Sequence, residues 1–144
     1  MPAFADLEVG AVVRSHLRRT IDEADNRWFA ALTDDWNPLH TDPDAAERAG
    51  WPKPLVNAAL TMGVVLGLSA PATSEGGGVS LGWDEVKLEA PVFPGDTLTA
   101  ETEILEKRES ASRPGYGVVS VRTRGLKQDG TEVISFRRAF LLPL

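Results

Sequence analysis

The hydrophobic residues in the first half of the chain recur at the spacing of helices. Residues 21–33 are predicted to form a helix with an apolar face, which consists of Ile21, Ala24, Trp28, Phe29 and Leu32. Thr20 and Glu23 form a capping-box pattern at its start. Pro38 has no backbone N–H and disfavours a helical Asn37, so the helix is expected to end within residues 34–38.

Two more helices are expected before the flexible segment SEGGG at residues 74–78. Asp42 is suited to cap a helix and Pro43 to occupy its first position, which predicts a short helix that ends at Gly50. A longer, mostly buried helix is expected at about residues 55–69. This apolar run contains Asn, Thr and Gly and is short for a membrane span.

After residue 78 the hydrophobic pattern changes to the period of two that is typical of strands. Residues 12–20 alternate in a similar way and predict a first strand. Four further strands are predicted in the segments VSLGWDEVKLEAPV, TLTAETEILEKRES, GYGVVSVRTRGLKQ and TEVISFRRAFLLP. Turn residues separate them at 93–96, 113–117 and 128–130, so we expect an antiparallel meander.

These elements predict a single α+β domain that spans residues 1–144. A twisted antiparallel sheet and one long apolar helix bury their apolar surfaces together when the sheet wraps around the helix, which is the arrangement of the hot-dog fold. Such a sheet has exposed edge strands, and pairing with a second copy is one way to cover them. We therefore expect a homodimer or a dimer-based oligomer.

Composition and charge narrow the classes of function. Of the 144 residues, 42% are hydrophobic and 25% are charged, as in ordinary globular proteins. The chain has no cysteine, which excludes disulfides, thiolate metal sites and a cysteine nucleophile. Its formal net charge of −6 argues against a nucleic-acid partner. Because MPAFADLEVGAVVRSH has no signal-peptide pattern, we expect a cytoplasmic protein without a membrane partner.

One polar stretch, TDDWNPLHTD at residues 33–42, combines the residue types of a proton-transfer site. Pro38 favours a bend, which would bring the Asp35 carboxylate and the His40 imidazole to one side. Histidine titrates near neutral pH and a carboxylate can orient it, while Asn37 can hold either partner by hydrogen bonds. Trp36 lies close enough in sequence to wall a pocket there. The same pattern also suits a solvated loop, and these residues alone leave both interpretations open.

The order of this stretch, then KPLVNAALT and then APVFPGDTL, closely resembles the MaoC-like hydratase family, which includes the (R)-specific enoyl-CoA hydratases. The resemblance runs from about FADLEVG to FRRAFL, and D-x-N-P-x-H is its most specific element. It implies that Asp35 and His40 activate a water that adds to C3 of a 2-enoyl-CoA thioester, with a proton going to C2. It also implies a hydro-lyase that needs no metal and no redox cofactor.

In this family a backbone amide at the start of the central helix donates to the thioester oxygen. The corresponding residue is Ala58, where many relatives have glycine after a histidine, and this chain has Asn57 before it. A Cβ makes close backbone approach less free, and the Asn57 side chain is an alternative donor. Both residues also suit the start of a buried helix.

The segments LGWDEV and RESASRPG resemble a subgroup associated with short branched or dicarboxylic acyl-CoA substrates, such as mesaconyl- or itaconyl-CoA. A second carboxylate would need an arginine partner, for which Arg113 is the first candidate and Arg108 and Arg138 are further ones. Arg113 is alternatively a candidate partner for a CoA phosphate. The bulky residues of LTMGVVLGL favour a short acyl chain. A hot-dog thioesterase and a non-catalytic acyl-thioester-binding subunit remain alternatives, although the complete D-x-N-P-x-H element argues against both.

Overall fold

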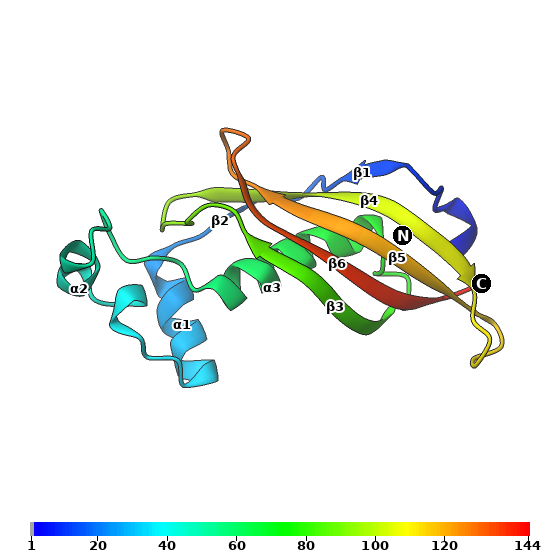
Figure 1. Cartoon of the computed structure of the whole chain (residues 1–144), viewed down its shortest axis with the longest axis horizontal. Coiled ribbons are helices and arrows are strands. Elements are labelled where there is room, and N and C mark those ends of the chain that lie inside the picture. The colour runs from blue at the N-terminus through cyan, green and yellow to red at the C-terminus, as the bar shows by residue number, and fades with distance from the viewer. Residues whose placement is uncertain (1) are drawn as a thin grey trace.

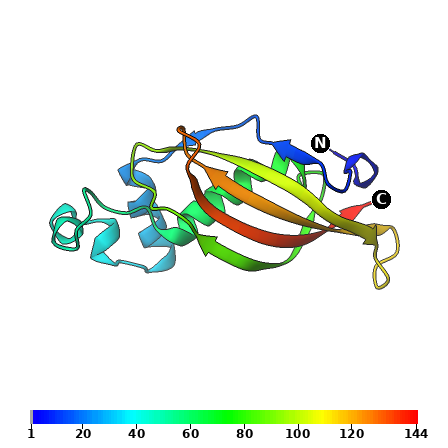
Figure 2. The ribbon, with the colours of Figure 1, turned by 45° about the horizontal axis from the view of Figure 1, so that its top comes forward.

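An antiparallel sheet of six strands wraps around one helix in the computed structural model, which describes residues 2–144 (Figure 1). The strands are β1 (Val12–Arg14), β2 (Arg19–Thr20), β3 (Val79–Leu88), β4 (Thr97–Glu109), β5 (Tyr116–Leu126) and β6 (Glu132–Pro143). The helices are α1 (Glu23–Thr33), α2 (Pro43–Arg48) and α3 (Ala58–Ser69), with short 3-10 turns η1 (Phe4–Asp6), η2 (Pro38–His40) and η3 (Ala70–Ala72). Figure 2 shows α1 and α2 beyond the N-terminal end of α3, at one end of the sheet. The predicted α+β arrangement, with a sheet around a central helix, is confirmed.

The sheet differs from the predicted meander at β3. Its order is β1-β4-β5-β6-β3, and β2 also pairs with β4. Consecutive pairing holds for β4, β5 and β6, but β3 pairs with β6 and forms the opposite edge. Residues 89–96 therefore cross the end of the sheet, and within this segment Val92 is buried and its carbonyl accepts from the Val56 amide at 2.8 Å. The meander prediction was wrong for β3 because short spacing does not determine which edge a strand joins.

Several element boundaries also differ from the prediction. The predicted strand at residues 12–20 is two short strands, because β1 and β2 are separated. Thr20 belongs to β2 and pairs with Thr97, so it does not cap α1. The cap is Asp22, which accepts from the Asp25 amide, while the Asp25 carboxylate accepts from the Asp22 amide. The predicted cap of α2 by Asp42 is confirmed.

The predicted apolar face of α1 was wrong in part. Trp28 and Leu32 are 72% and 80% exposed, whereas Asn26 and Ala30 are buried. The side of α1 that carries Asn26 faces the start of α3, where Asn26 binds the Asn57 amide. The polar Asn26 is therefore inside, and the large apolar side chains of Trp28 and Leu32 face solvent.

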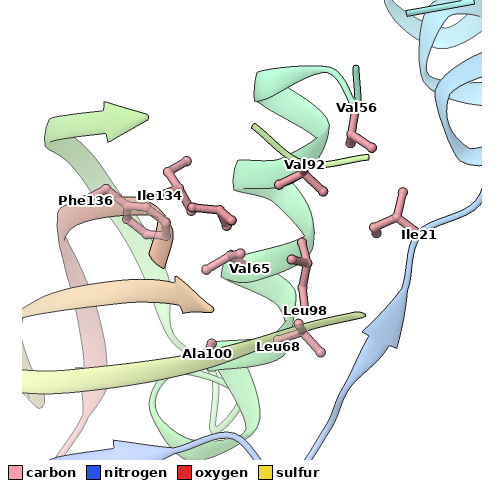
Figure 3. Packing of buried hydrophobic residues seen from close by; sticks show 10 residues of the cluster. Ile21, Val56, Val65, Leu68, Val92, Leu98, Ala100, Ile134 and Phe136 are labelled. Carbon is pink, nitrogen blue, oxygen red and sulfur yellow. The ribbon is translucent and has the colours of Figure 1, made fainter. Parts of the chain in front are cut away.

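The main core lies between α3 and the concave face of the sheet. Figure 3 shows Val65 of α3 directed toward Ile134 and Phe136 of β6, and all three side chains are buried. A Cβ on Gly125 of β5 would lie 2.5 Å from a Val65 methyl group, so glycine permits the close approach of helix and sheet. No helix within residues 2–144 is long and apolar enough to span a membrane.

Candidate active site

The D-x-N-P-x-H stretch connects α1 to α2. Asp34 ends α1 with a left-handed backbone (φ 59°), which turns the chain back on itself. The Asn37 side chain then accepts from the Leu39 amide at 3.1 Å and caps η2, whose first residue is Pro38. The bend expected from the proline is present, and it places His40 against the segment that leads into α3.

Asp35 is held by the residue that caps α3. The Asn57 side-chain amide donates to Asp35 Oδ2 at 2.7 Å, and the Asn37 backbone amide donates to Asp35 Oδ1 at 3.3 Å. Asn57 is buried while Asp35 is exposed. The carboxylate is therefore oriented from the protein side and open on the other.

His40 is oriented by a backbone carbonyl. Its Nδ1 lies 2.9 Å from the Leu55 carbonyl oxygen. A carbonyl oxygen only accepts hydrogen bonds, so Nδ1 carries the proton in the neutral ring and Nε2 carries the lone pair. His40 can thus accept a proton at Nε2.

A cavity of about 320 Å³ lies beside His40, at the N-terminal end of α3. Its walls are mostly apolar and include Trp51, Leu88, Val92 and Val133, while Thr61 adds a hydroxyl. Glu89 is the one acidic residue among those that line it, and no Lys or Arg of residues 2–144 belongs to the lining. Such a mostly apolar pocket with a few polar groups is typical of small-molecule sites.

Ala58 also lines this cavity and has an unused amide. Asn57 Oδ1 accepts from the amides of Ala59 (2.8 Å) and Leu60 (3.4 Å), and the Asn57 carbonyl accepts from the Thr61 amide. Within residues 2–144 the Ala58 amide makes no hydrogen bond. It is therefore the free donor of the first turn of α3, where partial positive charge favours an oxyanion. Ala58 lines the cavity and Asn57 does not, and one hydrogen of the Asn57 side-chain amide is engaged with Asp35, so this geometry favours Ala58 over the Asn57 side chain as that donor.

The structure does not bring Arg113 to the cavity. Arg113 is exposed in the β4–β5 turn, where its guanidinium lies 4.2 Å from the Tyr116 ring centroid. Figure 1 shows this turn at the end of the sheet opposite α1 and α2. Thirteen residues of β4 separate the two ends, or about 40 Å of strand.

Arg108 and Arg138 also lie outside the cavity lining. Arg138 is 4% exposed and donates to the hydroxyls of Ser69, Thr73 and Ser74 near the C-terminal end of α3. Desolvation of its guanidinium lowers the pKa to about 10, so it stays protonated at neutral pH. Arg138 is an internal structural cation in this chain.

Three contributors to the site were missed from the sequence. Trp51 lines the cavity, whereas Trp36 is 58% exposed and does not. Thr61 faces the cavity one turn into α3. Asn26 is buried under His40 and Asn57, and the only signal for it was a polar residue between the apolar positions of α1. Within residues 2–144, no group of three His, Cys, Asp or Glu side chains is placed to hold a metal ion, and the expectation of no cofactor stays a prediction.

Comparisons with known proteins identify the family of the chain. Residues 5–125 match the family described as MaoC like domain. The chain is 33% identical over 135 residues to the mesaconyl-CoA hydratase of Cereibacter sphaeroides, which covers 94% of this chain but only 39% of that protein. It is 33% identical over 137 residues to the (R)-specific enoyl-CoA hydratase of Aeromonas caviae, covering 95% of this chain and 96% of that one.

Solved structures show the same fold. The (R)-hydratase from A. caviae superposes with a TM-score of 0.77 over 95% of this chain and 98% of that chain. A Mycobacterium tuberculosis protein described as having a double hotdog fold superposes with a TM-score of 0.88 at 25% identity, over 99% of this chain and 44% of that one. Since the family match covers most of the sequence and a relative 33% identical is matched over nearly its full length, the chain belongs to the MaoC-like domain family.

Proposed function

We propose that the protein is a hydro-lyase that reversibly adds water across the 2,3 double bond of an enoyl-CoA thioester. The observation that carries this proposal is the placement of His40 and Ala58 on one cavity, with Asp35 held beside the same helix start by Asn57. The names of the relatives, hydratases of enoyl- and mesaconyl-CoA, support the same chemistry.

The residues divide the reaction between them. His40 Nε2 and the Asp35 carboxylate both accept hydrogen bonds, so a water that donates to them turns a lone pair toward C3 of the substrate. As the C3–O bond forms, one proton of the water passes to this pair and the π electrons move onto the thioester oxygen. The Ala58 amide donates to that oxygen as negative charge develops. A proton then returns from the pair to C2, which completes the addition of water.

The cavity supports a short, uncharged acyl group. Its volume of about 320 Å³ limits the acyl length and its walls are mostly apolar, so methylenes beyond those that fit would have to displace packed side chains. A substrate with a second carboxylate would need a cationic partner, and this chain supplies none in the lining, where Glu89 would instead repel it. We therefore favour crotonyl-like substrates over the dicarboxylic substrate named in the Cereibacter relative.

A homodimer is part of this proposal. The edge strand β3 exposes five apolar side chains, those of Val79, Leu81, Trp83, Val86 and Leu88. An exposed apolar edge is a site for pairing with another strand, and the double hotdog protein shows that two such units occur together in a relative. Since Leu88 also lines the cavity, the partner would lie next to the site. Light scattering should give twice the monomer mass of 15.5 kDa, and a monomer at all concentrations would contradict it.

Absence of cysteine fits a reducing compartment, and we propose the cytoplasm as the location of the protein.

The experiment that tests the activity is incubation of the purified protein with crotonyl-, octenoyl-, mesaconyl- and itaconyl-CoA. Loss of the enoyl chromophore with CoA still esterified shows hydration, whereas release of free thiol would show a thioesterase. Efficient crotonyl-CoA hydration is expected, and octenoyl-CoA hydration of similar efficiency would contradict the short-chain proposal. The Arg113→Ala variant should leave the ratio of mesaconyl- to crotonyl-CoA efficiency unchanged, and a fall in this ratio would return Arg113 to the site.

A further inference from the structure

We propose that Asn26 is a positioning residue that aligns His40 and the start of α3 with each other; this inference rests on the proposed hydratase function. Asn26 lies on α1, is 2% exposed and touches two segments far from it in the sequence. Its side-chain amide donates to the carbonyls of His40 (3.0 Å) and Leu55 (2.8 Å), and its Oδ1 accepts from the Asn57 backbone amide (3.0 Å).

The orientation of this side chain is determined by its neighbours. Its nitrogen faces two carbonyl oxygens, which can only accept, and its oxygen faces an N–H, which can only donate. Both amide hydrogens and one oxygen lone pair are therefore used. A leucine or alanine at this position would leave the buried Asn57 amide and the partly buried His40 carbonyl without these partners.

Asn26 and His40 share an acceptor. The Leu55 carbonyl receives a hydrogen bond from Asn26 and another from His40 Nδ1 at 2.9 Å. Asn26 thus holds the backbone of His40 and also the oxygen that selects its tautomer. The same side chain fixes the Asn57 backbone, which precedes the Ala58 amide and carries the side chain that binds Asp35. One buried amide therefore connects every group proposed for the reaction.

The test compares Asn26→Ala and Asn26→Ser with a matched control, Thr102→Ala. Thr102 is also 2% exposed, and its replacement by alanine removes one buried side-chain hydrogen bond, to Thr123. It lies on β4, outside the cavity lining. Misplacement of reacting groups by about 1 Å costs on the order of 10²-fold in rate. We expect kcat for crotonyl-CoA to fall by about that factor in Asn26→Ala and less in Asn26→Ser, which keeps one donor, with little change in KM. Thr102→Ala should retain kcat even if its stability falls equally.

Nitrogen-15 NMR of the histidine rings gives a readout that loss of stability does not move. The chain has only two histidines, and His16 is exposed, so its signals serve as an internal reference. In the native protein without substrate, His40 should be a single tautomer with the proton on Nδ1. In Asn26→Ala it should become a mixture, while Thr102→Ala and the His16 signals stay unchanged.

Two results would overturn the inference. One is a mixed His40 tautomer in the native protein, and the other is a native tautomer and native kcat in folded Asn26→Ala. If the native protein shows the single tautomer but hydrates no enoyl-CoA, the proposed function fails and the positioning role of Asn26 does not. In that case the nitrogen-15 NMR spectra of Asn26→Ala and Thr102→Ala test the positioning role without an activity measurement.

Discussion

The Asn57 side chain joins the proposed catalytic carboxylate to the helix that it caps, with its amide 2.7 Å from Asp35 Oδ2 and its oxygen 2.8 Å from the Ala59 amide. One residue thus performs two separable tasks. Its oxygen serves the stability of α3, and its nitrogen orients Asp35.

Substitution of Asn57 by aspartate should separate these tasks. Aspartate caps a helix as well as asparagine does, but it places a second carboxylate against Asp35 in place of a donor. We expect Asn57→Asp to retain α3 and to lose about 10²-fold or more in kcat. Asn57→Ala, which loses both tasks, should in addition lose about 1 kcal/mol of unfolding free energy. The measurements are urea unfolding and steady-state hydration. Native activity in Asn57→Asp would show that the contact with Asp35 has no role.

The unused Ala58 amide can be removed without removing the helix. Ala58 is the first residue of α3, where proline is well tolerated, and Asn57 already has the extended backbone (φ −56°, ψ 135°) that precedes proline. We expect Ala58→Pro to lose about 10²–10³-fold in kcat, the effect of deleting one oxyanion donor. Ala58→Val has similar bulk and keeps the amide, so it serves as the control. Equal activities of the two variants would exclude the Ala58 amide as the donor.

Asp96 lies just after the cavity-lining residues 88–92 and should make the unfolding free energy depend on pH. Desolvation raises the pKa of Asp96, but hydrogen bonds from Lys127, from the Phe93 amide and from Gln128, together with the Lys127 charge, outweigh it and hold the pKa below the usual 3.8. A carboxyl with a lowered pKa in the folded state stabilises the protein above its unfolded pKa. That stabilisation is lost as the pH falls below about 4 and through the folded pKa.

Asp96→Asn should therefore lower the unfolding free energy by about 1 kcal/mol at pH 7, and the gap to the native protein should narrow at pH 3. Urea unfolding of both proteins at the two pH values measures this. A gap of the same size at both pH values would contradict an ionised, hydrogen-bonded Asp96.

The parts of the site that were predicted from the sequence are those that depend on neighbouring residues. Pro38 and Asn37 define the turn before His40 by themselves, and the caps by Asp42 and Asn57 form within three residues. Such features are local, so they can be read from a short stretch of chain.

The parts that were missed depend on distant partners. The periodicity of α1 fits a helix with Trp28 and Leu32 inside, but the helix meets residues 40, 55 and 57 with Asn26 instead. The position of β3 depends on the route of residues 89–96, and the distance of Arg113 from the cavity depends on the length of β4. The local hydrophobic pattern determines neither the distance of Arg113 from the cavity nor the sheet edge that β3 joins.

The most direct test of the central claim is the rate of crotonyl-CoA hydration by Asp35→Asn and His40→Ala, with Asp34→Asn and His16→Ala as matched controls. Asp34 precedes the site and has a left-handed backbone that asparagine also adopts, and His16 is exposed between β1 and β2. We expect each site variant to lose ~10²–10⁴-fold in kcat, the range for one positioned acid–base group, with the native circular dichroism spectrum and with both controls fully active. Turnover near the native rate in either site variant would show that the proton transfers take place elsewhere.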